Sequence, residues 1–201
     1  KVERLDAECA RLQEAMRNNW DRPALCNYKG ESFTFGELAD KIARFHIVFE
    51  TIGLEKGDKI ALCAKNSARW AVSFLAINTY GTVVVPILAD FLPESIDSLV
   101  AHSGSRILFT DPDMWKKLDI SKMPEIVTVV SVADFSILYT ADEATSKALA
   151  DMPEMFKARY QDGVKPEDIS YPVDNDKELA VINYTSGTTS APKGVMLRYE
   201  C

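Results

Sequence analysis

A run of hydroxylated residues and glycine near the end of the chain is the part of the sequence best suited to chemistry. Residues 184–195 read Tyr-Thr-Ser-Gly-Thr-Thr-Ser-Ala-Pro-Lys-Gly-Val, between apolar runs that predict strands over 179–184 and 195–197. Hydroxyls and unhindered backbone N–H groups donate hydrogen bonds to phosphate oxygens, and a lysine adds a compact positive charge. The residues expected to bind a polyphosphate are Thr185, Ser186, Gly187, Thr188, Thr189, Ser190 and Lys193.

Two known nucleotide motifs and one structural alternative compete with this interpretation. Lys193 follows Gly187 at the distance of the Walker motif, but Pro192 replaces its second glycine and Gly194 replaces the hydroxylated residue that holds magnesium. The chain contains no G-x-G-x-x-G dinucleotide motif. A surface loop rich in turn-forming residues is the structural alternative, which the lysine and the flanking strands disfavour.

The elements that must position this loop alternate between strand and helix. Such alternation predicts parallel strands with helices on the faces of the sheet. We therefore expect an α/β fold with a mostly parallel sheet flanked by helices. The expected strands are 59–64, 82–87, 106–110, 126–132 and 179–184, with a separate hairpin of 24–28 and 32–35. The apolar helix between the first two parallel strands carries three residues expected in the core rather than in a ligand pocket: Trp70, Phe74 and Ile77.

Capping signals predict where two further helices begin. Thr34 and Glu37 have the spacing of a capping box, in which each side chain satisfies a backbone N–H group of the other residue. They precede an amphipathic helix over 36–52. Thr140 and Glu143 repeat the spacing before a more polar helix, so the same start is expected there.

The ends of the chain and one polar segment bear on domain organisation. Apolar residues at helical spacing begin at Val2, and the chain stops directly after an apolar run, so we expect a fragment of a longer protein. The polar helix breaks at Pro153 and leads into a surface connection at 163–177. We expect residues 1–172 to form an α/β subdomain, and residues 173–201 to form a strand–loop–strand unit that opens the next one.

Composition excludes several classes of function. The chain has 201 residues with 47% hydrophobic content, which is enough for a sizeable core. Its 23 basic and 30 acidic residues give a net charge of −7, which disfavours a broad nucleic-acid-binding face. No apolar run approaches the ~20 residues of a transmembrane helix, and no signal segment opens the chain. We expect a cytoplasmic protein, for which peripheral membrane contact stays open.

Cysteines and histidines do not predict a metal site. The four cysteines are widely and irregularly spaced, which predicts reduced, buried thiols: Cys9, Cys26, Cys63 and Cys201. With two histidines in the chain, a structural zinc site is not expected. His46 lies beside an apolar helix face, which predicts packing. His102 lies near a helix end, where a cation suits the helix dipole.

The predicted loop resembles the phosphate-binding signature of the adenylate-forming enzymes, Thr-Ser-Gly-Thr-Thr-Gly-x-Pro-Lys-Gly. This family includes acyl-CoA synthetases, luciferases and nonribosomal adenylation domains. The resemblance covers about residues 20–201, nearly the whole chain. Further segments resemble family blocks in the same order: 34–38, 53–62, 66–70, 80–87 and 102–109.

The resemblance implies the large N-terminal domain of such an enzyme, with ATP, Mg²⁺ and coenzyme A as its small molecules. In the family, a carboxylate attacks the α-phosphate of ATP, which forms an acyl-adenylate and releases pyrophosphate. A thiol, usually that of coenzyme A, then accepts the acyl group. The groups for adenine, ribose and magnesium, and the catalytic lysine of a small C-terminal domain, are implied to lie downstream. No catalytic residue and no metal ligand is therefore expected within this chain, and its missing C-terminal domain is an expected partner.

The sequence departs from the family pattern at two places, and its substrate is open. Ser190 replaces a glycine, and Arg198-Tyr199 stands where many relatives have Thr-His, so no role of that histidine is carried over. The run over 70–87, with its Tyr80-Gly81 pair, resembles fatty acyl-CoA synthetases. A medium- or long-chain fatty acid is the expected substrate. The alternatives are an amino-acid or aryl-acid adenylation enzyme, a catalytically inactive nucleotide-binding module, and a flavodoxin-like binding domain.

Overall fold

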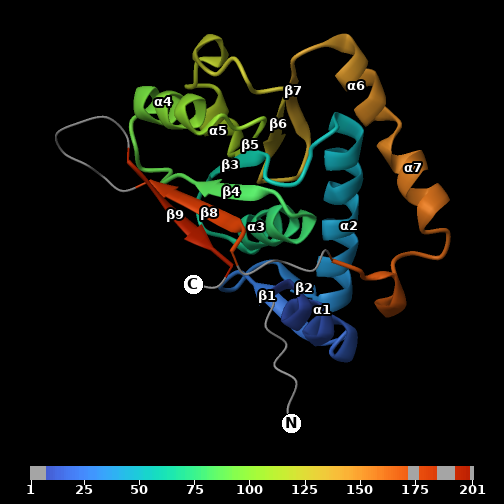
Figure 1. Ribbon diagram of the computed structural model, residues 1–201. Helices are drawn as coiled ribbons and strands as arrows, with labels where there is room; N and C mark the ends of the chain where they lie inside the picture. The colour runs from blue at the N-terminus through green and yellow to red at the C-terminus, as the bar shows by residue number, and fades with distance from the viewer. Residues whose placement is uncertain (1–7, 172–176, 185–192, 200–201) are drawn as a thin grey trace.

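The computed structural model describes residues 8–171, 177–184 and 193–199 (Figure 1). Its strands are β1 Pro23–Cys26, β2 Ser32–Thr34, β3 Lys59–Cys63, β4 Val83–Pro86, β5 Ile107–Thr110, β6 Thr128–Ser131, β7 Ile137–Thr140, β8 Leu179–Tyr184 and β9 Gly194–Arg198. Its α-helices are α1 Glu8–Asn18, α2 Phe35–Ile52, α3 Ala68–Tyr80, α4 Pro93–Ser103, α5 Pro112–Trp115, α6 Glu143–Ala150 and α7 Met152–Arg159. Two short 3₁₀ helices are η1 Ile120–Lys122 and η2 Pro166–Asp168.

Seven of these strands form one sheet in the order β7-β6-β5-β3-β4-β8-β9. The five inner strands are parallel to their neighbours, whereas β7 and β9 pair antiparallel at the two edges. The α/β fold with a mostly parallel sheet flanked by helices is thus confirmed. The boundary expected between residues 172 and 173 lies outside the described residues and stays a prediction, although β8 and β9 belong to the same sheet as β3–β7.

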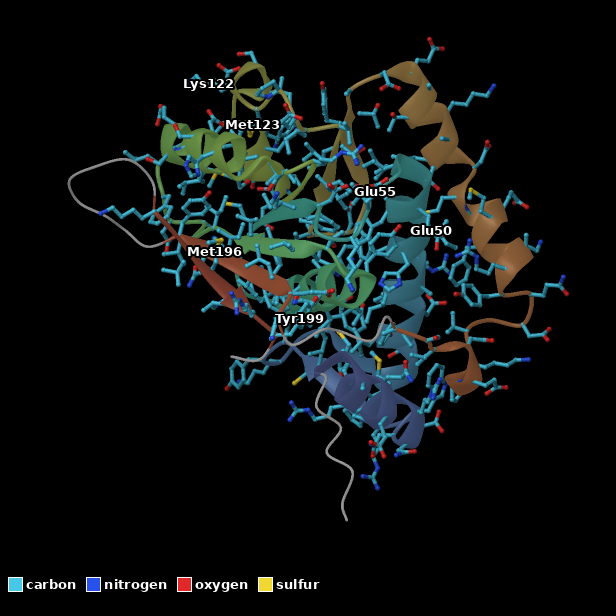
Figure 2. All side chains as sticks on the ribbon, in the orientation of Figure 1. Glu50, Glu55, Lys122, Met123, Met196 and Tyr199 are labelled. Carbon is cyan, nitrogen blue, oxygen red and sulfur yellow. The ribbon has the colours of Figure 1, made fainter. Side chains whose placement is uncertain are left out.

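Helices cover both faces of the sheet because successive strand residues point to opposite sides. Ile60 and Leu62 of β3 pack in the core beneath α2 and α3, while Ala61 and Cys63 pack in the core beneath α4. Figure 1 shows α3 below β4 and α4 above it. Ile77 of α3 is fully buried in the first core. The long α2 packs against α3, α6 and α7, so the α6–α7 segment forms a further layer outside α2 (Figure 2).

The capping box predicted at the start of α2 is confirmed. The Thr34 hydroxyl oxygen accepts a hydrogen bond from the Glu37 N–H at 3.2 Å, and the Glu37 carboxylate accepts one from the Thr34 N–H at 2.8 Å. The helix ends at Gly53, whose φ of +73° is in the left-handed region that favours glycine. The sequence therefore predicts both ends of α2, which contributes many of the buried residues of the main core.

The second predicted capping box is wrong. Thr140 lies in β7 and pairs with Thr128 of β6, so its backbone is committed to the sheet. Asp142 caps α6 instead, and its carboxylate accepts a hydrogen bond from the Thr145 N–H at 2.7 Å. Strand β7 itself was not predicted, because the turn before it uses Phe135 at φ +62° rather than a glycine or asparagine.

The connection after α7 is more buried than the sequence indicates. The broken helix is confirmed, with Pro153 in the first turn of α7. Ile169 is only 4% exposed and packs in the main core, which corrects the expectation of a surface connection for this part of the chain. The Arg17 guanidinium donates hydrogen bonds to the backbone oxygens of Pro166, at 3.2 Å, and of Ile169. Residues 163–171 therefore connect α1 to the core through these hydrogen bonds.

The thiols are not all buried. Cys9 and Cys63 are buried, and burial raises the pKa of Cys63 to about 12. Cys26 is exposed, which corrects the expectation for that residue, and Cys201 lies outside the described residues. In the parts of the chain that the structure describes, no helix is both long and apolar enough to span a bilayer. The predicted hairpin of β1 and β2 is confirmed, with Lys29 in its turn at φ +53°.

Candidate functional site

The predicted phosphate-binding loop connects two paired strands. Strand β8 pairs antiparallel with β9, and Tyr184 is the register partner of Gly194. Lys193 is described, and it lies exposed directly before β9. A Cβ atom at Gly194 would lie 2.7 Å from Ile182 Cγ2, so a side chain there would require the Ile182 side chain or the strand itself to shift. The other six predicted loop residues lie outside the described residues: Thr185, Ser186, Gly187, Thr188, Thr189 and Ser190.

Strand β8, which precedes this loop, is held in place by a contact that the sequence did not predict. The Tyr184 side chain is 6% exposed, and its hydroxyl lies 2.8 Å from His102 Nδ1 in the last turn of α4. The two rings also pack edge to face, with centroids 5.8 Å apart. Burial raises the pKa of the Tyr184 phenol, so the hydroxyl keeps its proton at neutral pH. His102 does lie at a helix end as predicted, but its observed partner is this tyrosine.

A cavity opens at the carboxyl ends of β3, β4 and β8, beside the point where the loop leaves β8. We call this 240 Å³ space the hairpin cavity; it is lined by Ala64, Lys65, Asn66, Trp70, Pro86, Ile87, Leu88, Ala89, Asp90 and Asn183. Trp70 and Phe74 stack with ring centroids 5.5 Å apart, and both are half-buried. Both rings pack against the main core, as expected, and Trp70 also lines this cavity.

A larger groove, which we call the edge groove, continues across the carboxyl ends of the parallel strands. This edge groove has a volume of about 760 Å³ and is lined by Asn27, Glu31, Lys65, Ser67, Arg69, Ala89, Asp111, Pro112, Asp113, Met114, Lys117, Val132 and Ala133. It shares Lys65 and Ala89 with the hairpin cavity, so the two spaces adjoin. In open α/β sheets, ligands bind outside the carboxyl ends of the strands, where successive connections diverge to opposite faces. The divergence here is between β3 and β5, over which the edge groove lies.

Hydrogen bonds to two of the carboxylates in the edge groove hold its walls together. The Arg69 guanidinium donates two hydrogen bonds to the Glu31 carboxylate, at 2.8 and 2.6 Å, which lowers the pKa of Glu31. The Asp111 carboxylate accepts a hydrogen bond from the Lys65 N–H at 3.0 Å, which joins the ends of β3 and β5. These contacts link the β1–β2 hairpin, α3 and two parallel strands around one groove.

The remaining sequence candidates do not join this site. The His46 ring is packed in the core, where Nε2 lies 3.1 Å from both the Ala76 oxygen and Thr79 Oγ1. Within the described ranges, no group of three or more His, Cys, Asp or Glu residues has the geometry to hold a metal ion.

Comparisons with known proteins agree with this geometry. Long-chain-fatty-acid–CoA ligase 1 of Schizosaccharomyces pombe (strain 972 / ATCC 24843) is 28% identical over 189 residues, which are 90% of this chain and 26% of the ligase. Surfactin synthase subunit 2 of Bacillus subtilis (strain 168) is 27% identical over 194 residues, which are 94% of this chain and 5% of that protein. The chain thus spans about a quarter or less of these relatives.

A solved structure of the anthranilate CoA ligase AuaEII in complex with anthranoyl-AMP has the same fold. It aligns with a TM-score of 0.76 over 96% of this chain and 35% of the other, at 16% sequence identity. A family model described as AMP-binding enzyme matches residues 12–200. Because that match covers nearly the whole chain, the chain belongs to the AMP-binding enzyme family.

Proposed function

We propose that this chain is the N-terminal part of an ATP-dependent ligase that activates a carboxylic acid as an acyl-adenylate and transfers the acyl group to coenzyme A. The supporting observation is the pairing of β8 with β9. These two strands flank the Thr185–Lys193 segment, and β8 ends beside the hairpin cavity. That position is at the carboxyl ends of the parallel strands, where α/β folds bind their ligands.

In this proposal the segment holds the β- and γ-phosphates of ATP. Its hydroxyls and backbone N–H groups donate hydrogen bonds to the phosphate oxygens, and the exposed Lys193 ammonium offsets the charge that develops as pyrophosphate leaves. The Tyr184–His102 contact fixes the strand from which the segment starts. Magnesium, coenzyme A and a C-terminal domain of the same protein enter the proposal through the family resemblance. The division at residues 172–173 and a cytoplasmic location also stay proposals.

The proposed substrate is a medium- or long-chain fatty acid. The resemblance of residues 70–87 to fatty acyl-CoA synthetases and the 28% identity to a long-chain-fatty-acid–CoA ligase support it. An amino acid or an aryl acid is the second candidate, favoured by the similarity to a surfactin synthase subunit and to the anthranilate CoA ligase. Both candidates use the same adenylation chemistry and differ in the acid that is activated.

Pyrophosphate exchange into ATP by the complete protein, with a panel of fatty, aromatic and amino acids, tests the proposal. We expect exchange with fatty acids. Exchange confined to amino or aryl acids would overturn the proposed fatty-acid substrate but leave the proposed adenylation reaction standing. No exchange with any acid would favour the inactive nucleotide-binding module. We expect no exchange from the isolated 201 residues.

A further inference from the structure

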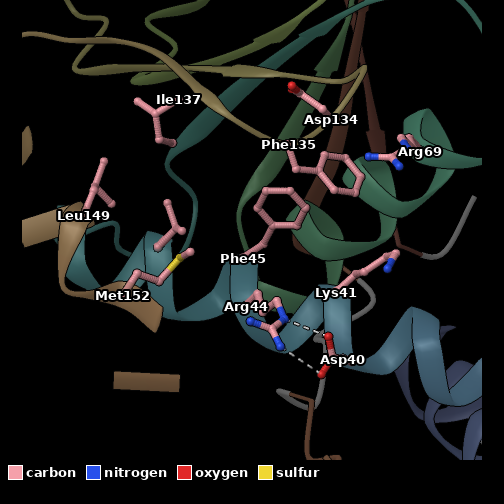
Figure 3. Close-up of a pocket in the computed structure, with 11 residues that line it drawn as sticks. Asp40, Lys41, Arg44, Phe45, Arg69, Asp134, Phe135, Ile137, Leu149 and Met152 are labelled. Atoms are coloured by element: carbon pink, nitrogen blue, oxygen red, sulfur yellow. Dashed lines mark hydrogen bonds and ion pairs between the residues drawn. The ribbon is translucent and has the colours of Figure 1, made fainter. Parts of the chain in front are cut away.

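A third cavity lies against α2 and shares no lining residue with the hairpin cavity. We call it the α2 pocket: a space of about 340 Å³ between α2, the turn from β6 to β7, and the α6–α7 segment (Figure 3). Its lining is Asp40, Lys41, Arg44, Phe45, Val48, Arg69, Asp134, Phe135, Ile137, Leu149 and Met152. The volume is at the lower end of the range for small-molecule sites. Among its lining residues, Arg69 also lines the edge groove.

The walls of the α2 pocket are apolar and include a strained residue. Figure 3 shows Phe45, Ile137, Leu149 and Met152 around the open space. Phe135 has φ +62°, a conformation that bulky side chains rarely adopt, and its ring packs edge to face on Phe45 with centroids 4.9 Å apart. Such backbone strain persists where the surrounding structure imposes it, often at ligand sites.

Among the cations at the rim of the pocket, Lys41 differs from the two arginines in forming no ion pair with a described residue. Arg44 pairs with Asp40 at 2.7 Å, and Arg69 is occupied by Glu31. The Asp134 carboxylate accepts hydrogen bonds from the N–H and the hydroxyl of Ser136, at 3.1 and 2.7 Å.

The Lys41 ammonium lies 4.6 Å from the centroid of the Phe33 ring and forms no ion pair with a carboxylate of the described residues. Its charge helps to lower the pKa of Glu31, but that carboxylate is held by Arg69. A ligand with one negative charge would supply an ion-pair partner for Lys41. A cationic ligand would instead meet the three cations Lys41, Arg44 and Arg69, of which the two lining carboxylates, Asp40 and Asp134, offset only part.

We propose that the α2 pocket binds a small apolar carboxylate, separate from the adenylation site. The hydrocarbon or aryl body of the ligand lies against Phe45, Phe135 and Met152, and its carboxylate pairs with Lys41. Burial of the apolar body supplies most of the affinity. The ion pair at the rim selects the sign of the charge, because a partly exposed pair contributes little energy.

The test uses 4-phenylbutyrate and its amine analogue 4-phenylbutylamine with the complete protein, without ATP. Methionine methyl groups labelled with ¹³C report where each ligand binds, because Met152 lines the α2 pocket and Met114 lines the edge groove. We expect 4-phenylbutyrate to shift the Met152 signal in a saturable manner and to leave Met114 unchanged. We expect the amine to bind at least about fivefold more weakly.

Two pairs of variants locate the binding. Ile137→Trp should fill the pocket from its rim and abolish the Met152 shift, whereas Met155→Trp, at a residue of similar exposure outside the lining, should not. Lys41→Gln should weaken 4-phenylbutyrate binding by about two- to fivefold, with no such effect from Lys147→Gln on α6.

Equal binding of the amine and the acid would overturn the proposal, as would a response of Met114 without Met152 or full binding by Ile137→Trp. Because ATP and catalysis are absent from these measurements, their outcome is independent of the proposed ligase function. A separate titration with ATP should leave the Met152 shift in place, and loss of that shift on addition of ATP would contradict a separate site.

Discussion

Protonation of His46 should destabilise the fold below neutral pH, by an amount that follows from the surroundings of the ring. The imidazole packs near Phe49, Tyr80 and Tyr171, with centroids 5.2–6.4 Å away. Its Nε2 lies 3.1 Å from the Ala76 oxygen, which assigns the proton of the neutral ring to that nitrogen. Burial therefore lowers the pKa of His46 from 6.5 to about 4, despite the opposing hydrogen bond to Ala76.

The sign and size of the effect follow from this lowered pKa. Above pH 6.5 the ring is neutral in both the folded and the unfolded protein, and the full stability is present. As the pH falls below 6.5, the unfolded protein binds the proton first, so the free energy of unfolding decreases until the pH reaches about 4. At about 1.4 kcal/mol per pH unit the loss is at most about 3.5 kcal/mol, of which about 2 kcal/mol is lost by pH 5.

Urea unfolding of the wild type and of His46→Gln at pH 7, 6 and 5 measures the effect. Glutamine keeps an N–H donor for the Ala76 oxygen but does not titrate, so the variant should lose stability at pH 7 and little more on acidification. The difference between the two proteins should shrink by about 2 kcal/mol from pH 7 to pH 5. A difference that is constant with pH would refute the assignment of a buried, neutral ring, whatever other groups titrate in that range.

Three further changes test the hairpin and the loop. Gly194→Ala should destabilise the protein by roughly 1–3 kcal/mol in urea unfolding, because its Cβ would lie 2.7 Å from Ile182 Cγ2, and adding Ile182→Ala should recover part of the loss. Tyr184→Phe should cost about 1 kcal/mol by removing the hydrogen bond to His102, which the same assay measures; unchanged stability would contradict that contact's role. Ser190→Gly restores the family residue and should leave pyrophosphate exchange close to that of the wild type, so a large loss would mean that the serine hydroxyl is required.

The sequence predicted those elements whose conformation depends on residues close together in the chain. Thr34 and Glu37 satisfy each other's backbone, and the resulting helix start needs no distant partner. The same spacing failed at Thr140 because pairing with Thr128 placed that residue in a strand. Cross-strand pairing depends on a partner in another strand, which the local spacing of Thr140 and Glu143 does not encode.

Only the part of the site that consists of adjacent residues could be predicted from the sequence. The run of hydroxyl groups before Lys193 is visible in the sequence because its residues are adjacent. The hairpin cavity brings together Trp70 and Asn183, which are far apart in the chain and meet only because β8 pairs with β4. The His102–Tyr184 contact likewise joins the end of α4 to β8. Neither pair has a spacing that a motif could encode.

The central claim is that the segment between β8 and β9 holds the phosphates of ATP, and Lys193→Ala in the complete protein tests it most directly. The Lys193 side chain is exposed, so its loss should leave folding nearly unchanged. Pyrophosphate exchange should fall by about 10²-fold or more, the scale for removing one group that stabilises developing charge. Lys147→Ala, an exposed lysine on α6, is the matched control and should keep wild-type exchange. Wild-type exchange by a folded Lys193→Ala variant would contradict the account.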